Sequence, residues 1–258
     1  MNSLINPRIY IGFLLLVSIV AQSQPEIQKQ LPSSDEFWVI NGPKVQKINE
    51  QGVILTDYHS HSLGVPTNID TSDPFRVMIF YHQPQTLVIL NSDGLAIGEP
   101  VSFTDLALGE VTLACRSSRG GAWLFHRESN ELLLTNPQFT RIVQRTLIKT
   151  RYSPNCLKEA NGLIYLGINN NSIQQLDSYG AKLNEFNILY DEYFMVDANF
   201  LWIIHNGLVE KRAIHDPFKI FGFFRCSCNT YPLIIKGEPK CLDGNKLITC
   251  EKITATGR

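Results

Sequence analysis

The sequence lacks a surplus of either charge. Its 258 residues carry 23 Lys and Arg against 24 Asp and Glu, which gives a formal net charge of −1 at pH 7. Nucleic acids and anionic membranes attract proteins through a positive field, so this balance predicts neither as a partner. The composition is 44% hydrophobic and 18% charged, which excludes a disordered chain and suffices for the core of one domain.

The short motifs of several enzyme classes are also missing. The chain contains no G-x-S-x-G, H-E-x-x-H, Walker A or EF-hand sequence. These absences argue against the hydrolases, phosphoryl-transfer enzymes and calcium sites that are built on such motifs. No catalytic residue, metal or cofactor is predicted, and a non-enzyme is favoured. A site assembled from separate segments of the chain stays open.

An apolar run of membrane-spanning length is absent. Residues 9–21 are mostly apolar, but this run is shorter than the ~20 residues that a membrane helix needs. It follows the single positive charge of Arg8 and leads to the small residues Ala21 and Ser23. That order predicts a secretory signal peptide over residues 1–23, with an uncleaved anchor as the alternative.

The remaining residues 24–258 are predicted to form a single exported domain without a membrane segment. They show no sustained 3.6-residue periodicity, so we expect very little helix. No linker or second domain is evident, and the oligomeric state is left open.

Cysteine is scarce but not absent. The chain has six, all in the exported part: Cys115, Cys156, Cys226, Cys228, Cys241 and Cys250. Cys115 and Cys156 occupy like positions in neighbouring repeats, which favours two buried thiols over a bridge. The other four crowd the C-terminus, where we expect one disulfide tying the last repeat. A zinc site is less favoured, because the C-x-C spacing differs from the usual C-x-x-C pair.

What the sequence does contain is an apolar tetrad that returns about every 40 residues. Its copies begin at Trp38, Ile79, Trp123, Tyr165 and Trp202. A period of this length is typical of a β-propeller, in which each repeat forms one four-stranded blade.

Each repeat divides into short runs of Val, Ile, Leu and aromatic residues, which indicate antiparallel strands. In the second repeat, the expected strands cover residues 66–70, 77–81, 86–90 and 96–103. An Asn/Asp-x-x-Gly turn follows the third run of three repeats, and its glycine supplies the positive φ of a hairpin.

We therefore predict an all-β propeller of about six four-stranded antiparallel blades, with five blades as the alternative. The sixth repeat is weak, but it places Cys241 about 40 residues after Trp202. Residues 26–31 are expected to pair with the last blade and close the ring, which would remove exposed strand edges.

The repeat plan resembles that of the NHL, YWTD and TolB-like six-bladed propellers. Residues 68–70 form a short strand ending in Asp, residues 76–81 an aromatic-rich strand, and residues 87–94 a strand ending in an Asn/Asp-x-x-Gly turn. Residues 196–204 repeat the first two of these features. The resemblance covers roughly residues 24–252, although the YWTD tetrad is absent and the Asp is replaced in several repeats. It implies a binding or scaffold role, often for proteins, peptides or glycans, and carries over no catalytic residue.

Charged side chains stand at the end of the first strand in four consecutive repeats. They are Asp70, Arg116, Glu159 and Asp197. In such propellers this position faces the central axis, so we expect these residues to form a ligand-binding funnel at the channel mouth. The alternative is a satisfied polar plug that keeps the ring in register.

Three histidines end the second strand of their repeats: His82, His126 and His205. They are candidates for a ligand-facing rim, and the alternative is that they close each strand onto its turn. Equivalent positions on separate blades should lie too far apart to share one metal ion.

Two further segments have an unusual composition. Residues 116–121, Arg-Ser-Ser-Arg-Gly-Gly, have the groups of an anion-binding concavity, although a tight turn is favoured. Residues 218–224 are rich in Phe and are expected to form the outer strand of the fifth blade, or a partner-binding patch if exposed.

Taken as a sequence, the chain is expected to be an exported, non-enzymatic propeller of the bacterial cell envelope, periplasmic or extracellular, that binds a protein, peptide or glycan. Two alternatives stay open. One is a metal-dependent hydrolase or lyase with its site at the channel mouth, and the other is a structural envelope component.

Overall fold

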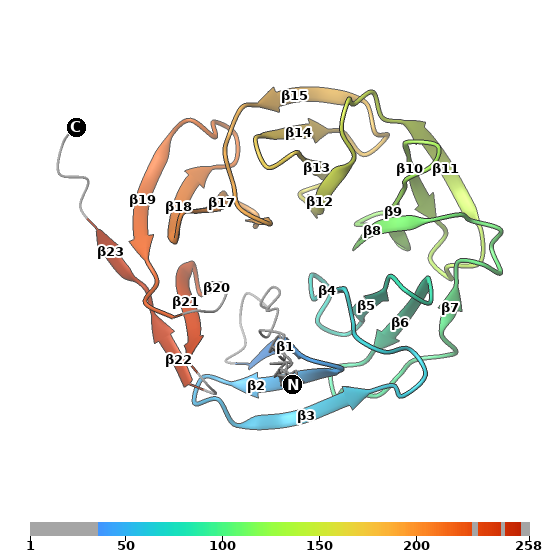
Figure 1. Cartoon of the computed structure of the whole chain (residues 1–258), viewed down its shortest axis with the longest axis horizontal. Helices are drawn as coiled ribbons and strands as arrows, with labels where there is room; N and C mark the ends of the chain where they lie inside the picture. Colours follow the sequence, from blue (N-terminus) through green and yellow to red (C-terminus); the bar gives the residue numbers. More distant parts are fainter. Residues whose placement is uncertain (1–35, 229–231, 244–245, 254–258) are drawn as a thin grey trace, which may run out of the picture.

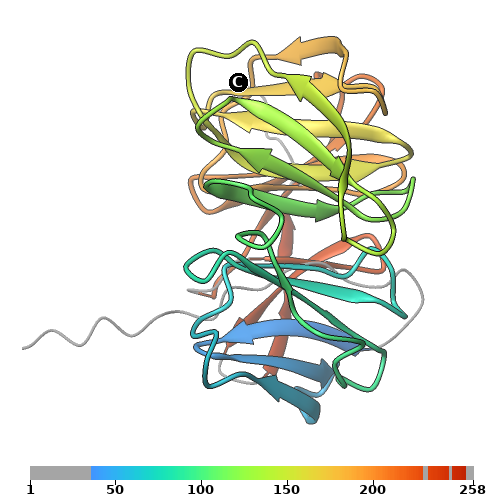
Figure 2. The same cartoon turned by 90° about the vertical axis from the view of Figure 1, so that its right-hand side faces the viewer.

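The computed structural model describes residues 36–228, 232–243 and 246–253. These residues form six antiparallel sheets that follow one another around a ring in chain order (Figure 1). Seen from the side, the ring is thinner than it is wide (Figure 2). The prediction of an all-β propeller with six blades is therefore confirmed. The described part of the chain contains no helix, and so none that could cross a membrane.

The first three blades occupy the blue-to-green half of the ring. Blade one contains β1 (Glu36–Asn41), β2 (Lys44–Asn49) and β3 (Ile54–His59). Blade two contains β4 (Asn68–Asp70), β5 (Val77–Tyr81), β6 (Thr86–Leu90) and β7 (Val101–Ser102). Blade three contains β8 (Val111–Arg116), β9 (Ala122–His126), β10 (Glu131–Thr135) and β11 (Ile142–Leu147).

The other three blades complete the ring. Blade four contains β12 (Pro154–Ala160), β13 (Leu163–Ile168), β14 (Ser172–Leu176) and β15 (Lys182–Phe186). Blade five contains β16 (Phe194–Val196), β17 (Phe200–His205), β18 (Leu208–Ala213), β19 (Ile220–Arg225) and β23 (Glu251–Ile253). Blade six contains β20 (Leu233–Ile235), β21 (Glu238–Asp243) and β22 (Lys246–Thr249).

The repeated tetrads lie in strands that are buried on both faces. Within its sheet, β9 is hydrogen-bonded to β8 and β10, and neighbouring blades cover both sides. A strand in this position has no solvent face, so its residues are apolar without alternation. The side chains of Trp38, Trp123 and Trp202 are each at most 1% exposed. The tetrads thus supply the apolar layers between the blades.

Blade six packs against blade one and so closes the ring. One apolar cluster joins Phe37, Val39 and Ile48 to Leu233 and Ile235. The strand predicted over residues 26–31 lies outside the described residues. Within them, blades one and six have three strands each, so the prediction of four strands per blade holds for blades two, three and four.

The last described strand, β23, adds a fifth strand to blade five. It pairs antiparallel with β19 and lies at the outer edge of the ring (Figure 1). Residues 220–224 of the Phe-rich segment lie in β19, the fourth strand of blade five, which was predicted as its outer strand, and β23 pairs along the far side of β19. Part of the apolar surface of the Phe-rich segment stays exposed, notably at Phe218 and Phe221.

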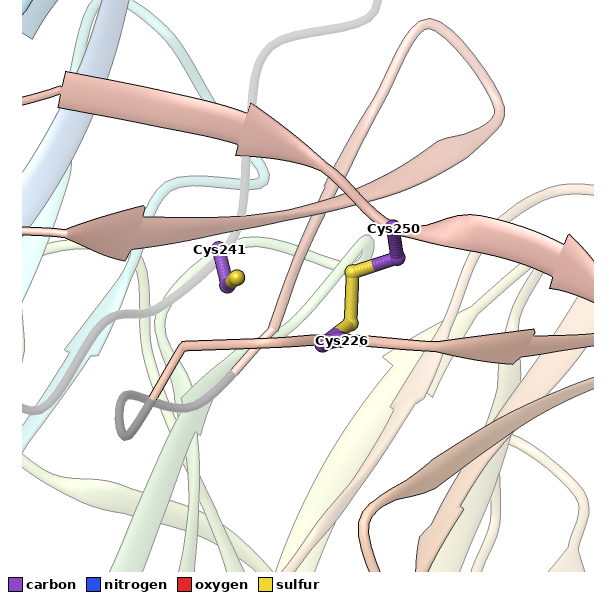
Figure 3. Close-up of side chains that lie close together, drawn as sticks. All are labelled: Cys226, Cys241 and Cys250. Atoms are coloured by element: carbon purple, nitrogen blue, oxygen red, sulfur yellow. A yellow bond between two sulfur atoms is a disulfide. The ribbon is translucent and has the colours of Figure 1, made fainter.

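Two disulfides fasten the C-terminal segment, where only one was predicted. Cys226 bonds Cys250, which joins the end of β19 to the residue between β22 and β23 (Figure 3). Cys228 bonds Cys241 in β21. Cys115 and Cys156 are buried free thiols, as predicted, and burial raises the pKa of both.

Candidate functional site

Strands alternate in direction within each blade, so the turns after the first and third strands lie on one face of the ring. We call this the mouth face. It carries the turns that follow β4, β8, β12 and β16, and therefore the residues predicted for a ligand-binding funnel. The turns after the second strands lie on the opposite face.

A cavity of about 390 Å³ opens on the mouth face between blades two and five. Its lining includes Arg116, Glu159 and Asp197, three of the four residues predicted for the funnel. Asp70 does not line it, although the next turn residues, Ser72 and Asp73, do. The cavity is thus assembled from the turns of four consecutive blades.

The charged residues at this cavity also tie blade two to blade three. One carboxylate oxygen of Asp70 accepts a hydrogen bond from the Arg116 backbone N–H at 3.0 Å, and the other accepts one from the Ser72 N–H at 2.8 Å. The Arg116 guanidinium donates to Asp73 at 2.9 Å. Burial lowers the pKa of Arg116, and the charge of Asp73 opposes this effect. Asp70 is thus engaged on both oxygens, as a structural plug requires.

Glu159 and Asp197 each hold the indole of a buried tryptophan. Glu159, in blade four, accepts a 2.7 Å hydrogen bond from the Trp123 Nε1–H of blade three. Its other oxygen accepts one from the Ser118 N–H at 2.9 Å. Asp197 accepts the Trp202 Nε1–H at 2.7 Å. These carboxylates therefore orient the tryptophans. Asp197 Oδ1 also accepts hydrogen bonds from the Asn199 and Phe200 N–H groups at 2.8 Å each, so both lone pairs of this oxygen are engaged.

We expect Asp70→Ala to lower the free energy of unfolding by about 1–3 kcal/mol, because it leaves the N–H groups of Ser72 and Arg116 without their acceptor. Denaturant titration measures the loss. Asp105→Ala is the control, since that exposed side chain has no interaction in the described structure and its loss should cost under about 0.5 kcal/mol. Equal stability of Asp70→Ala and Asp105→Ala would contradict a structural role for Asp70.

A second cavity continues the first toward blade six. Its volume is about 330 Å³, and it shares Asp197 and Ala198 with its polar neighbour. Its walls are more apolar, with Phe200, Trp202 and Ile234 among them. Of its lining, only Asp197 was predicted as a site residue, because the repeat pattern places Phe200 and Trp202 in the core and Ile234 in the weak sixth repeat. The two cavities adjoin at the shared residues Asp197 and Ala198, and together they are here called the mouth groove.

The charges along the mouth groove differ from one end to the other. The polar part contains one guanidinium, from Arg116, and the carboxylates of Asp73, Glu159 and Asp197. The apolar part is lined by one cationic side chain, Lys236, and the Lys211 ammonium lies 4.0 Å from the centroid of the lining Phe200 ring. The polar part therefore carries a negative net charge, which favours a cationic group there.

The three predicted rim histidines lie on the opposite face and are each engaged locally. His82 Nε2 lies 3.3 Å from Glu110, and His205 Nδ1 lies 3.1 Å from Asp191. His126 Nδ1 lies 2.6 Å from the Ser129 hydroxyl in the turn that follows. These contacts favour the alternative, in which each histidine closes its strand onto the adjoining segment.

The segment 116–121 forms a tight turn whose backbone donors are used within the protein. The Ser117 N–H donates to the Gly121 carbonyl, and the Gly120 N–H donates to the Ser117 carbonyl. Arg119 reaches blade four, where its guanidinium lies 5.2 Å from the centroid of the Tyr179 ring. The turn interpretation therefore fits this segment better than an anion-binding concavity.

Among the described residues, one group of three His, Cys, Asp or Glu side chains has its donor atoms within 4.8 Å of one another. It consists of Cys226, Cys241 and Cys250, near the edge of the ring. All three sulfurs are in disulfides, which removes the thiolates that bind a metal.

Comparison with known proteins gives the fold and no family. No protein-family model and no curated sequence matches the chain. Virginiamycin B lyase from Staphylococcus aureus is similar in structure, with a TM-score of 0.55, 13% identity, and coverage of 92% of this chain and 86% of that chain. The Pan2 WD40 domain of Neurospora crassa has a TM-score of 0.54 and 10% identity over 84% of this chain and 72% of that one.

A streptogramin B lyase structure gives a TM-score of 0.49 and 15% identity, with 75% of this chain and 66% of that chain covered. At such identities, similarity extends to architecture and not to chemistry. The chain is a β-propeller whose activity must be argued from its own site.

Proposed function

We propose that this protein is an exported, non-enzymatic propeller that binds an extended peptide segment of a partner protein in the mouth groove. Export is supported by the signal-like order of residues 1–23 and by the two disulfides, which are typical of oxidising compartments. A role in binding agrees with the resemblance to NHL, YWTD and TolB-like propellers.

The observation that carries the proposal is the continuity of a polar and an apolar cavity. Asp197 and Ala198 line both, so the two cavities adjoin at this turn and a ligand lying across it can contact both. An extended peptide places side chains at regular intervals along such a groove. The net negative part suits a Lys or Arg side chain, and the part beside Phe200 suits an apolar one.

Some polar groups in the groove are not fully hydrogen-bonded within the protein and can therefore bind a ligand. The exposed Ser118 hydroxyl has no partner among the described residues, and Glu159 accepts one hydrogen bond at each carboxylate oxygen, which leaves each oxygen a second lone pair. Ala198 is exposed at the junction, where its carbonyl accepts a 2.6 Å hydrogen bond from Asn161. A larger side chain at residue 198 would fill the groove while leaving this backbone contact in place.

We expect Ala198→Trp to weaken peptide binding at least about tenfold, because the indole would occupy the junction and keep the peptide from contacting both cavities. A tenfold loss corresponds to about 1.4 kcal/mol of binding free energy. The probes are peptides selected from a random displayed library, with affinities measured by calorimetry. Ala181→Trp is the matched control, since Ala181 is also exposed but lies outside the groove.

Selected peptides should pair a basic residue with a nearby apolar one and should lose binding with Ala198→Trp alone. The proposal fails if no peptide binds, if both tryptophan variants bind equally well, or if a neutral glycan competes for the groove where peptides do not.

A further inference from the structure

Another cavity lies on the opposite face of the ring, at the outer edge of blade four. Its volume is about 570 Å³, within the range of about 300–1,000 Å³ that small-molecule sites occupy. Three parts of the chain line it: residues 149–152, which lead into β12; the end of β13 with the turn into the start of β14; and β15 with the residues that follow. It shares no lining residue with the mouth groove. We call it the blade-four cavity.

Three cationic side chains line the blade-four cavity against one acidic side chain. Lys149 and Arg151 are exposed and form no ion pair within the described residues. Lys182 pairs with Glu185, which lies three residues further along β15. Two positive charges therefore remain uncompensated at a concave surface, where low-dielectric walls strengthen their field.

Glu185 does not cancel this field, because its carboxylate is already engaged. Lys182 donates to it, and the Ser172 hydroxyl donates to its other oxygen at 3.3 Å. The hydrogen bond from Lys182 is the main reason that the pKa of Glu185 is lowered. Glu185 thus stays ionised and paired with Lys182, so it does not neutralise Lys149 or Arg151.

The uncharged part of the lining offers amides and one aromatic ring. The side chains of Asn171 and Asn187 are exposed and hydrogen-bond to nothing in the described structure. The Arg151 guanidinium lies 5.5 Å from the centroid of the exposed Tyr152 ring, which holds charge and aromatic surface together. An amide both donates and accepts hydrogen bonds, and so does a sugar hydroxyl. A sugar ring also presents an apolar C–H face that can stack on the exposed Tyr152 ring, which an acidic side chain does not offer.

We propose that the blade-four cavity binds an anionic oligosaccharide that carries carboxylates, of the uronic acid class. Lys149 and Arg151 would bind the carboxylate through charge-assisted hydrogen bonds. Asn171 and Asn187 would bind ring hydroxyls, and Tyr152 would cover one sugar face. This site is independent of the mouth groove and does not require the proposed peptide ligand.

The test measures binding of oligogalacturonate hexamers to the full exported chain by calorimetry, with maltohexaose and hexaglutamate as comparison probes. The double variant Lys149→Ala, Arg151→Ala should weaken oligogalacturonate binding at least about tenfold, as expected for the loss of charge-assisted hydrogen bonds. The matched control is Arg141→Ala, Lys246→Ala. It removes the same charge from exposed residues outside the cavity and should leave binding unchanged.

A second variant, Asn171→Ala with Asn187→Ala, separates sugar recognition from simple attraction of anions. It should weaken oligogalacturonate and leave any hexaglutamate binding unchanged. The proposal is supported if oligogalacturonate binds more tightly than both other probes and responds to both variants. It is overturned if oligogalacturonate does not bind, if hexaglutamate binds as tightly, or if the two charge variants behave alike.

Discussion

Replacing Trp202 with Ala is expected to lower the free energy of unfolding by about 3–5 kcal/mol, because removal of a large buried aromatic leaves a cavity. Trp202 is 0% exposed and packs in the apolar cluster between blades four and five. Its indole N–H also donates to Asp197, which would lose that donor. For a domain of this size, the melting temperature should fall by roughly 6–20 °C.

Phe75→Ala is the control for this substitution, since Phe75 is 72% exposed on the turn between β4 and β5. Its loss should change stability by no more than about 0.5 kcal/mol. Denaturant titration compares both variants with the unchanged protein. A loss below about 1 kcal/mol for Trp202→Ala would mean that the tetrads do not form the layers between the blades.

Removing the disulfide Cys226–Cys250 should cost roughly 2–4 kcal/mol, since a cross-link restricts the unfolded chain. It closes a separation of 24 residues and attaches the segment around β23 to β19. The double variant Cys226→Ser, Cys250→Ser should therefore melt well below the unchanged protein under oxidising conditions. Under reducing conditions, the two should melt at nearly the same temperature.

Thiol counting provides an independent check on this pattern. Alkylation of the native protein should label no cysteine, because both free thiols are buried, and denaturation without reductant should expose Cys115 and Cys156 alone. Labelling of Cys226 or Cys228 under those conditions would show that the disulfides do not form.

The sequence predicted the blades best where burial on both faces leaves only apolar residues. The run 77–81 is β5 without any change of bounds, and 86–90 is β6. The run 96–103 was harder, since an outer strand has a solvent face, and only Val101–Ser102 pairs as β7. The pairing of β23 with β19 could not be foreseen, because a short exposed strand carries little apolar signal.

For the candidate site, the position of a residue in the repeat predicted where it lies in the ring, but not what its side chain contacts. Arg116, Glu159 and Asp197 occupy similar positions at the end of a first strand, so the ring brings them to one cavity. Their hydrogen bonds to backbone and indole N–H groups depend on side-chain geometry that a repeat does not encode. The blade-four cavity was missed altogether, because Lys149 and Arg151 lie in a connection between blades, outside the repeated pattern.

The location of the bound peptide tests the central claim most directly. A photo-crosslinking amino acid is placed at residue 118 on the mouth face or at residue 128, which is exposed on the opposite face. The selected peptide is then irradiated with each protein, and the products are identified by mass spectrometry. We predict cross-links from residue 118 that disappear in the Ala198→Trp background, and none from residue 128. Cross-links from residue 128, or cross-links from residue 118 that persist with Trp at 198, would contradict binding in the mouth groove.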